Sequence, residues 1–305
     1  MMEKAPRKMI IIFISLMCFV LAFYISVQPR NLKTLDLEQN WLDVQQQRKA
    51  ILNYTCTKFK LYRHDGILDP SVAKMLYVEH NHKFIYCEVP KVGCTSWKRI
   101  LLLLTMNISR DFSELPQESV HTARMYTKLS SYSPNKQRQL LNNYTKVMFS
   151  RQPFERLVSA YRDKFHRNRT DDYYIKSIAG FIKSKFRKSN ESEGPLTFIE
   201  FVRFILQEPP KHSDIHWRPM SLLCDPCNIR YDIIGKFENL KQDSNHVLMD
   251  IGAPKDFYYP HIREHATDTG EEASKSYFRN LSSDHLQGLV SRYYLDFKLF
   301  GYPVF

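Results

Sequence analysis

Short apolar runs alternate with helix-compatible stretches through most of the chain. The clearest strand candidates are "KFIYCEV" at residues 83–89 and "TKVMFS" at residues 145–150, and each runs directly into a polar loop. Helical patterns follow at residues 95–104 and 153–165, and a further helix is expected at residues 283–296. Strands that alternate with helices are typical of an α/β domain built on a mainly parallel sheet.

A different pattern occupies the N-terminus. Residues 9–27 are apolar or weakly polar without a charge, which is long enough to cross a bilayer as a helix. Basic residues precede this segment, so the positive-inside rule predicts a cytosolic tail over residues 1–8 and a single-pass signal anchor. A cleaved signal peptide is the alternative, but the apolar segment is long for one and no small-residue cleavage site follows it.

The rest of the chain divides into a stem and one domain. Residues 28–60 are polar, rich in Gln and lack a strand pattern, which predicts a luminal stem with some helix. The α/β pattern then extends over residues 61–305, and this length suits one large domain with its own core.

The charge of the chain narrows the choice of partner. A net charge of +12 indicates a polyanionic partner: nucleic acid, a membrane surface or an acidic polysaccharide. Six N-x-[ST] sequons, all beyond the anchor, favour the luminal side, where nucleic acid is not expected. An anionic glycan is therefore the expected partner, and the basic segment 166–195 is either a solvated insertion or a further contact for it. The sequons are Asn53, Asn107, Asn143, Asn168, Asn190 and Asn280.

The cysteines fit an oxidising compartment. Cys18 lies in the anchor, and the other five are Cys56, Cys87, Cys94, Cys224 and Cys227. Because five is odd, at least one of these is free or forms an intermolecular bond. "CDPC" at residues 224–227 resembles half of a zinc site, but no second pair with ligand spacing follows. A local disulfide or a buried thiol pair is expected there instead.

The first polar loop, "PKVGCTS", lies where a strand ends and a helix begins. Free N–H groups at a helix start carry partial positive charge and hold an anion, and Lys91 adds a full charge. An ordinary strand–turn–helix with a capping hydroxyl is the alternative. The loop lacks the GK[ST] ending of a nucleotide kinase. The candidate phosphate-binding residues are Pro90, Lys91, Val92, Gly93, Cys94, Thr95 and Ser96.

The second loop, in "SRQPFERLVSAYRDKF", offers a second phosphate site. Arg151 stands at the strand end and Ser159 eight residues on, and a guanidinium binds phosphate bidentately. On the helix that follows, Phe154, Leu157 and Val158 share one face and are expected to pack on the sheet. A ligand with two separated phosphates would use both loops. The candidate residues are Arg151, Gln152, Pro153, Phe154, Glu155, Arg156, Leu157, Val158 and Ser159.

These two stretches resemble the 5′- and 3′-phosphosulfate-binding motifs of Golgi carbohydrate sulfotransferases. Residues 216–248 and 293–302 are similar to further blocks of the HNK-1 sulfotransferase family, which includes chondroitin, dermatan and GalNAc 4-O-sulfotransferases. The chondroitin 4-O enzymes look most similar. The resemblance implies a P-loop-like sulfotransferase domain, 3′-phosphoadenylyl sulfate as donor without a required metal, a glycan acceptor and a Golgi membrane location. The chain departs from the family at Ser150 and Gln152, but neither change removes a group that donates a hydrogen bond to a phosphate.

The implied reaction is an in-line sulfuryl transfer. Charge develops on the leaving oxygen, and Lys91 is the expected stabiliser. A sugar hydroxyl also needs a general base. The candidates are His121, in the interval where related uronyl 2-O-sulfotransferases keep their base, His216 in the family-like "HW" block, and Glu88. A non-catalytic glycan-binding relative is a further alternative, but the retention of Lys91, Arg151 and Ser159 argues against it.

Overall fold

The protein is described from a computed structural model, whose main compact unit runs from Arg48 to Phe305. The structure describes residues 39–63, 66–107, 120, 125–166, 173–187, 194–259 and 271–304. Residues 39–58, within the predicted stem, form a helix. None of the helices in the described ranges is both long and apolar enough to span a bilayer. The predicted anchor at residues 9–27 lies outside these ranges.

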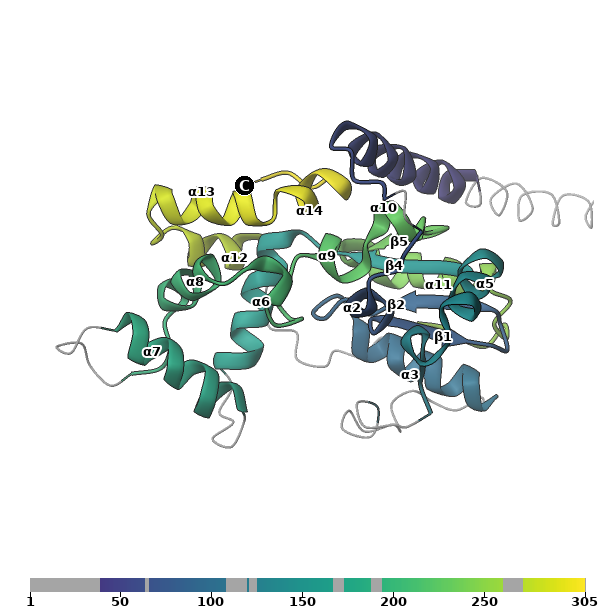
Figure 1. The fold of residues 1–305 in the computed structure, drawn as a ribbon, viewed down its shortest axis with the longest axis horizontal. Coiled ribbons are helices and arrows are strands. Elements are labelled where there is room, and N and C mark those ends of the chain that lie inside the picture. Colours follow the sequence, from purple (N-terminus) through teal and green to yellow (C-terminus); the bar gives the residue numbers. More distant parts are fainter. Residues whose placement is uncertain are drawn as a thin grey trace, which may run out of the picture. The chain divides into compact units, whose positions relative to one another are not determined.

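A five-stranded sheet forms the centre of this unit (Figure 1). Its strands are β1 (Leu76–Glu79), β2 (Phe84–Cys87), β3 (Thr127–Lys128), β4 (Thr145–Ser150) and β5 (Ile233–Lys236). The spatial order is β3-β1-β2-β4-β5, in which β2, β4 and β5 pair in parallel and β1 is antiparallel to both of its neighbours. Four of the five strands therefore run in one direction, as the alternating pattern predicted. Because parallel strands end at one edge, the loops after β2, β4 and β5 meet there.

The helices surround the sheet and extend beyond it on one side. Their bounds are α2 (Pro70–Ala73), α3 (Cys94–Met106), α5 (Pro134–Asn143), α6 (Pro153–Phe165), α7 (Gly180–Phe186), α8 (Phe198–Gln207), α9 (Met220–Cys224), α10 (Pro226–Ile229), α11 (Leu240–Asp250), α12 (Glu271–Phe278), α13 (Ser283–Arg292) and α14 (Tyr294–Leu299). α3 and α6 confirm two predicted helices. The third, at residues 283–296, is divided at Tyr293 into α13 and α14.

α6 shows why the second motif folds as it does. The Gln152 side-chain oxygen accepts hydrogen bonds from the N–H groups of Phe154 (2.6 Å) and Glu155 (2.9 Å). Pro153 takes the first helical position, where its missing N–H costs no bond. The predicted apolar face packs in a cluster of helical residues rather than on the sheet, because aromatic rings of neighbouring helices cover it. Phe154, for example, lies 4.7 Å from Phe278 and 5.1 Å from Phe297 between ring centroids.

Two long-range disulfides tie distant segments together. Cys56 pairs with Cys227 and Cys87 pairs with Cys224, with sequence separations of 171 and 137 residues, whereas Cys94 is free. The expectation of a local pair within "CDPC" is therefore wrong, because each of its cysteines faces a different distant partner. In the chain-entropy view, one bond that closes a loop of this length contributes about 5 kcal/mol, and the second contributes less because it then closes a much shorter loop. The expectation of an unpaired cysteine among the five is confirmed.

The sequons can be placed in part. Asn53, Asn107, Asn143 and Asn280 are exposed, so each is accessible to modification. Asn168 and Asn190 lie outside the described residues.

Candidate active site

The loop between β2 and α3 makes a tight turn that requires glycine. Val92 N–H donates to the Val89 carbonyl (3.3 Å), and Lys91 and Gly93 adopt φ angles of 71° and 73°. A Cβ atom at Gly93 would lie 2.6 Å from Leu240 Cδ2 and 2.7 Å from the Tyr259 hydroxyl. The close approach of these side chains, together with a backbone conformation that residues with a side chain rarely adopt, therefore favours glycine at this position.

The carbonyl groups of this loop are turned towards protein donors. Arg156 Nε donates to the Pro90 carbonyl (2.9 Å), Arg151 Nη1 to the Lys91 carbonyl (3.1 Å) and the Tyr259 hydroxyl to the Gly93 carbonyl (3.4 Å). Within the described chain, no side chain caps the start of α3. The partial positive charge of a helix start favours an anion at this end of α3.

Arg151 brings the second motif against the first. Its side chain is 3% exposed, its guanidinium lies 4.0 Å from the centroid of the Phe237 ring, and Nε is 3.7 Å from the Glu155 carboxylate. Burial lowers the pKa of Arg151 to about 10, so the group stays charged at neutral pH. Ser159 is buried further along α6, and its proposed contact with a phosphate stays a prediction.

Arg156 connects the donor loop to a second loop at residues 213–218. Besides Pro90, its guanidinium donates to the carbonyls of Arg218 (2.7 Å) and Ile215 (2.9 Å), and the residue is 2% exposed. The three donor nitrogens therefore all have carbonyl partners. This geometry suits Arg156 to position both loops, and its predicted contact with a phosphate stays a prediction.

The change Arg156→Lys tests this positioning role. An ammonium cannot reach three carbonyls in different directions, so at least one charged hydrogen bond is lost, which costs about 1.5–3 kcal/mol of stability. We expect kcat/KM to fall about tenfold because two loops lose their register. Urea unfolding and steady-state kinetics measure the two effects, with the exposed residue Arg203 of α8, changed to lysine, as the control. A variant of lower stability but unchanged kcat/KM would show that Arg156 only supports the fold.

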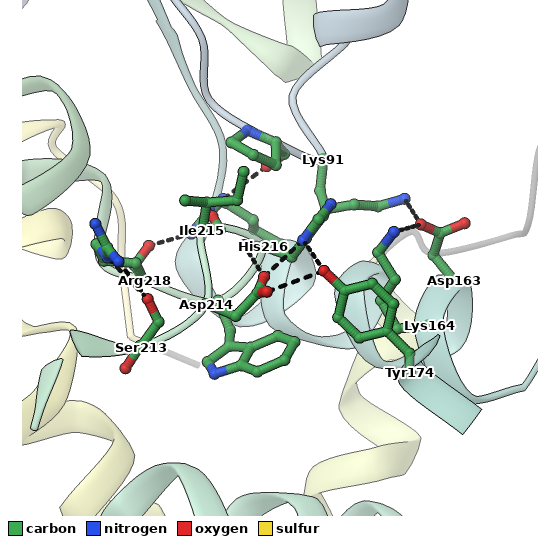
Figure 2. Close-up of polar contacts among 12 residues, drawn as sticks. Lys91, Asp163, Lys164, Tyr174, Ser213, Asp214, Ile215, His216 and Arg218 are labelled. Atoms are coloured by element: carbon green, nitrogen blue, oxygen red, sulfur yellow. Dashed lines mark hydrogen bonds and ion pairs between the residues drawn. The ribbon is translucent and has the colours of Figure 1, made fainter. Parts of the chain in front are cut away.

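His216 is held by a carboxylate two residues before it. Asp214 Oδ1 accepts from the His216 backbone N–H (2.8 Å) and lies 2.6 Å from its Nδ1. The Tyr174 hydroxyl donates to Asp214 Oδ2 (2.9 Å) and is 3.1 Å from the same Nδ1 (Figure 2). Because a carboxylate accepts, we assign the imidazole proton to Nδ1. Nε2 is then left with a free lone pair.

Two lysines act electrostatically on this histidine. Lys91 Nζ lies 3.2 Å from Asp163 Oδ2, Lys164 Nζ is 3.6 Å from the same atom, and Lys164 sits 4.5 Å from the Tyr174 ring centroid (Figure 2). Lys91 is therefore linked to His216 through Asp163, Lys164 and Tyr174. Burial, followed by the charges of Lys164 and Lys91, lowers the pKa of His216 below its usual value, although Asp214 opposes this. A neutral imidazole at neutral pH is the form that a general base requires.

The other candidate bases are placed differently. His121 lies outside the described residues. Glu88 is buried, and its two carboxylate oxygens contact Lys98 Nζ (2.5 Å) and the Tyr77 hydroxyl (2.8 Å). Since both oxygens are already engaged, Glu88 is less suited to accept a proton.

The free cysteine lies at the start of α3. Burial raises the pKa of the Cys94 thiol, which keeps it protonated.

Four residues near the centre were not identified from the sequence: Asp163, Lys164, Tyr174 and Asp214. For Asp214 a signal exists, because a side chain two residues before a histidine can form an Asx turn with it. Asp163 and Lys164 fall one turn beyond Ser159 in the motif already quoted. Tyr174 begins a π-helical turn, η3 (Tyr174–Ala179), and its approach over 42 residues has no local signature.

The site combines three features. A helix with an uncapped start follows one parallel strand, an arginine follows the next, and a lysine lies near a histidine (Figure 2). This combination is typical of an enzyme that transfers a group from a phosphate-bearing donor. The sequence model of the sulfotransferase family matches residues 74–303, and the chain belongs to that family.

Three curated relatives are similar over most of the chain. Human carbohydrate sulfotransferase 9 is 36% identical over 291 residues, which cover 91% of this chain and 65% of the relative. Mouse carbohydrate sulfotransferases 8 and 11 are each 34% identical, over 90% and 85% of this chain and 68% and 76% of their own lengths. The chain thus spans about two thirds of the first of these proteins. No solved structure matches it.

Proposed function

We propose that this protein transfers a sulfuryl group from 3′-phosphoadenylyl sulfate to a glycan, and that the acceptor is the 4-hydroxyl of GalNAc in chondroitin. Membership of the sulfotransferase family supports the reaction, and relatives named carbohydrate sulfotransferases support a glycan acceptor. The choice of chondroitin rests on the sequence blocks quoted above. The observation that carries the proposal is that Lys91, the uncapped start of α3 and the His216–Asp214 pair belong to one site.

The residues present suit such a donor. The turn at Gly93, which a Cβ would fill, and the first N–H groups of α3 would hold the 5′-phosphosulfate. Arg151, which remains charged despite its burial, and Ser159 would hold the 3′-phosphate. When bound, the donor supplies a sulfuryl group on a phosphate oxygen that can leave. In the described ranges, no group of three His, Cys, Asp or Glu side chains is arranged to hold a metal.

The chain's own residues divide the work of the reaction. His216 Nε2 would take the proton of the acceptor hydroxyl, and Asp214 would stabilise the imidazolium that forms. Lys91, restrained here by Asp163, would place its ammonium beside the oxygen on which negative charge grows. Burial lowers the pKa of Lys91, so it can also be a better hydrogen-bond donor than a fully hydrated lysine.

The same proposal includes a location. Residues 9–27 would anchor the protein in the Golgi membrane with the catalytic domain, residues 61–305, in the lumen. Two disulfides and four exposed sequons suit an oxidising compartment where glycans are added.

Sulfate transfer by the full-length protein is the primary test. The protein is incubated with radiolabelled donor and a panel of desulfated chondroitin, dermatan, a GalNAc-capped N-glycan and a glucuronyl (HNK-1-type) oligosaccharide. We expect label on chondroitin, at the GalNAc 4-position in disaccharide analysis. Label on another acceptor would keep the reaction and change the substrate. Donor binding without any transfer would instead support a non-catalytic glycan-binding protein.

Arg151→Ala tests the second phosphate site. Loss of a bidentate charged contact should weaken binding of adenosine 3′,5′-bisphosphate, the desulfated product, about 10- to 100-fold. Isothermal titration calorimetry measures this affinity, with Arg203→Ala as the control of equal charge change. An unchanged affinity in Arg151→Ala would contradict the assignment of the second loop.

A further inference from the structure

A basic cavity lies on the sheet edge opposite the donor loops. It has a volume of about 500 Å³, and its walls come from α5, the start of β4, α10, residues 62–63 and residues 66–68. Four basic side chains and one acidic side chain line it: Arg63, Arg138, Lys146, Arg230 and Asp232. The net positive charge of the lining therefore favours a ligand with negative charge.

Its position follows from strand direction. Lys146 is near the start of β4 and Asp232 directly precedes β5, whereas Arg151 and Phe237 follow the ends of these strands. Five steps along extended chain lead from Lys146 to Arg151, which is about 16 Å at about 3.3 Å per residue. Figure 1 shows the same arrangement, with α5 and α6 at opposite ends of β4. The cavity is thus separate from the proposed reaction centre.

The charges in the cavity are of two kinds. Lys146 Nζ is paired with Asp232 (2.7 Å), and Arg63 Nη2 is paired with Asp225 (2.5 Å). Arg138 and Arg230 are exposed and form no ion pair within the part of the chain that the structure describes. Arg230 has a left-handed φ of 57°, which is uncommon for a residue with a side chain. Two guanidinium groups are therefore available to an incoming anion.

Hydrogen bonds and a disulfide hold the cavity wall beside Arg63 in place. The Asn228 side chain accepts from the Arg63 backbone N–H (2.8 Å) and donates to Asp225 Oδ1 (2.7 Å) and to the Leu61 carbonyl (3.3 Å). The disulfide from Cys227 to Cys56 holds the same helix. Because α10 and residues 61–63 are joined in this way, the cavity exists before any ligand binds, which lowers the entropic cost of binding.

We propose that this cavity is a second binding site for a glycan chain, and that it takes a carboxylate or sulfate group of sugars far from the acceptor sugar. Arginine suits both groups because its planar fork binds an oxyanion bidentately. Given the distance to Arg151, only a chain of several sugars reaches both places, so the site favours long acceptors. The identity of the polymer rests on the proposed function, but the presence of an anion site does not.

The double variant Arg138→Gln/Arg230→Gln tests this site in the full-length protein. Binding of chondroitin sulfate and of unsulfated chondroitin is measured by surface plasmon resonance, each as long chains and as disaccharides. We expect long chains to bind about tenfold more weakly at low salt, with a shallower salt dependence, because two charged contacts are lost. Disaccharides, which are too short to reach both places, should bind the double variant as they bind the unmodified protein. The control Arg203→Gln on α8 should bind long chains as the unmodified protein does.

Each outcome decides the proposal. A loss with sulfated chains alone assigns the site to sulfate, and a loss with both polymers shows that carboxylates suffice. Unchanged binding of long chains by the double variant overturns the proposal. So does a loss of binding to anionic phospholipid vesicles with glycan binding intact, which would make the cavity a membrane contact. If the unmodified protein sulfates no acceptor, the proposed function fails, yet the binding difference between the variants still reports on the cavity.

Discussion

Replacing Lys91 by alanine is expected to lower kcat about 100- to 1,000-fold, the usual cost of removing one preorganised group that stabilises developing charge. The substitution leaves the turn intact, because the loop is held through its backbone carbonyls by Arg151 and Arg156. Donor affinity should therefore change far less than kcat. Single-turnover kinetics with saturating donor, together with calorimetry for donor binding, separates the two quantities.

Two further variants sharpen the test of Lys91. Lys211→Ala removes a lysine of similar charge whose side chain is 65% exposed and pairs with Asp69, so kcat should be unchanged. Asp163→Asn removes the partner of Lys91 while retaining its volume, so kcat should be kept within a few-fold. Equal losses of kcat and donor affinity in Lys91→Ala would instead make Lys91 a binding residue that acts before the transition state.

Replacing His216 by asparagine is expected to lower kcat about 100- to 10,000-fold, the range for loss of a general base. The pH profile gives a second signature. Because burial and the charges of Lys164 and Lys91 lower the pKa of His216, its neutral form persists below pH of about 6.5. The acid limb of kcat/KM should thus lie below that pH and disappear in His216→Asn. Asp214 acts against the shift, so Asp214→Asn should move the limb to still lower pH.

Controls for His216 come from two other histidines. His212, exposed and four residues earlier, should tolerate asparagine without loss of rate. His121→Asn tests the rival base predicted from the sequence. If His121→Asn abolishes turnover and His216→Asn retains both the rate and the acid limb, the base is His121 and the Asp214 pair supports the loop only.

Local patterns predicted the elements that carry the donor motifs. β4 and α6 have the predicted bounds, and α3 extends the predicted helix by a residue or two at each end, because each is marked by a proline, a glycine or a continuous apolar run. The same local rules place Lys91 and Arg151 at the ends of neighbouring parallel strands.

Features that depend on distant segments were harder to predict. The apolar face of α6 was expected on the sheet, yet rings from α12 and α14 cover it, and these lie more than a hundred residues further along the chain. Arg156 was predicted as a phosphate ligand from its residue type, and its three carbonyl partners become visible only when the loops are brought together. The disulfide partners of Cys224 and Cys227 likewise follow from the three-dimensional arrangement alone.

Those disulfides also set an order of events during synthesis. Cys56, Cys87 and Cys94 leave the ribosome long before Cys224 and Cys227, because separations of 137 and 171 residues lie between the bonded pairs. For most of translation, three thiols are therefore present without their native partners, and Cys87 and Cys94 are only seven residues apart. A premature bond between these two would cross the donor loop. Correct maturation thus depends on keeping the early thiols reduced, or on reshuffling them, until the last quarter of the chain arrives.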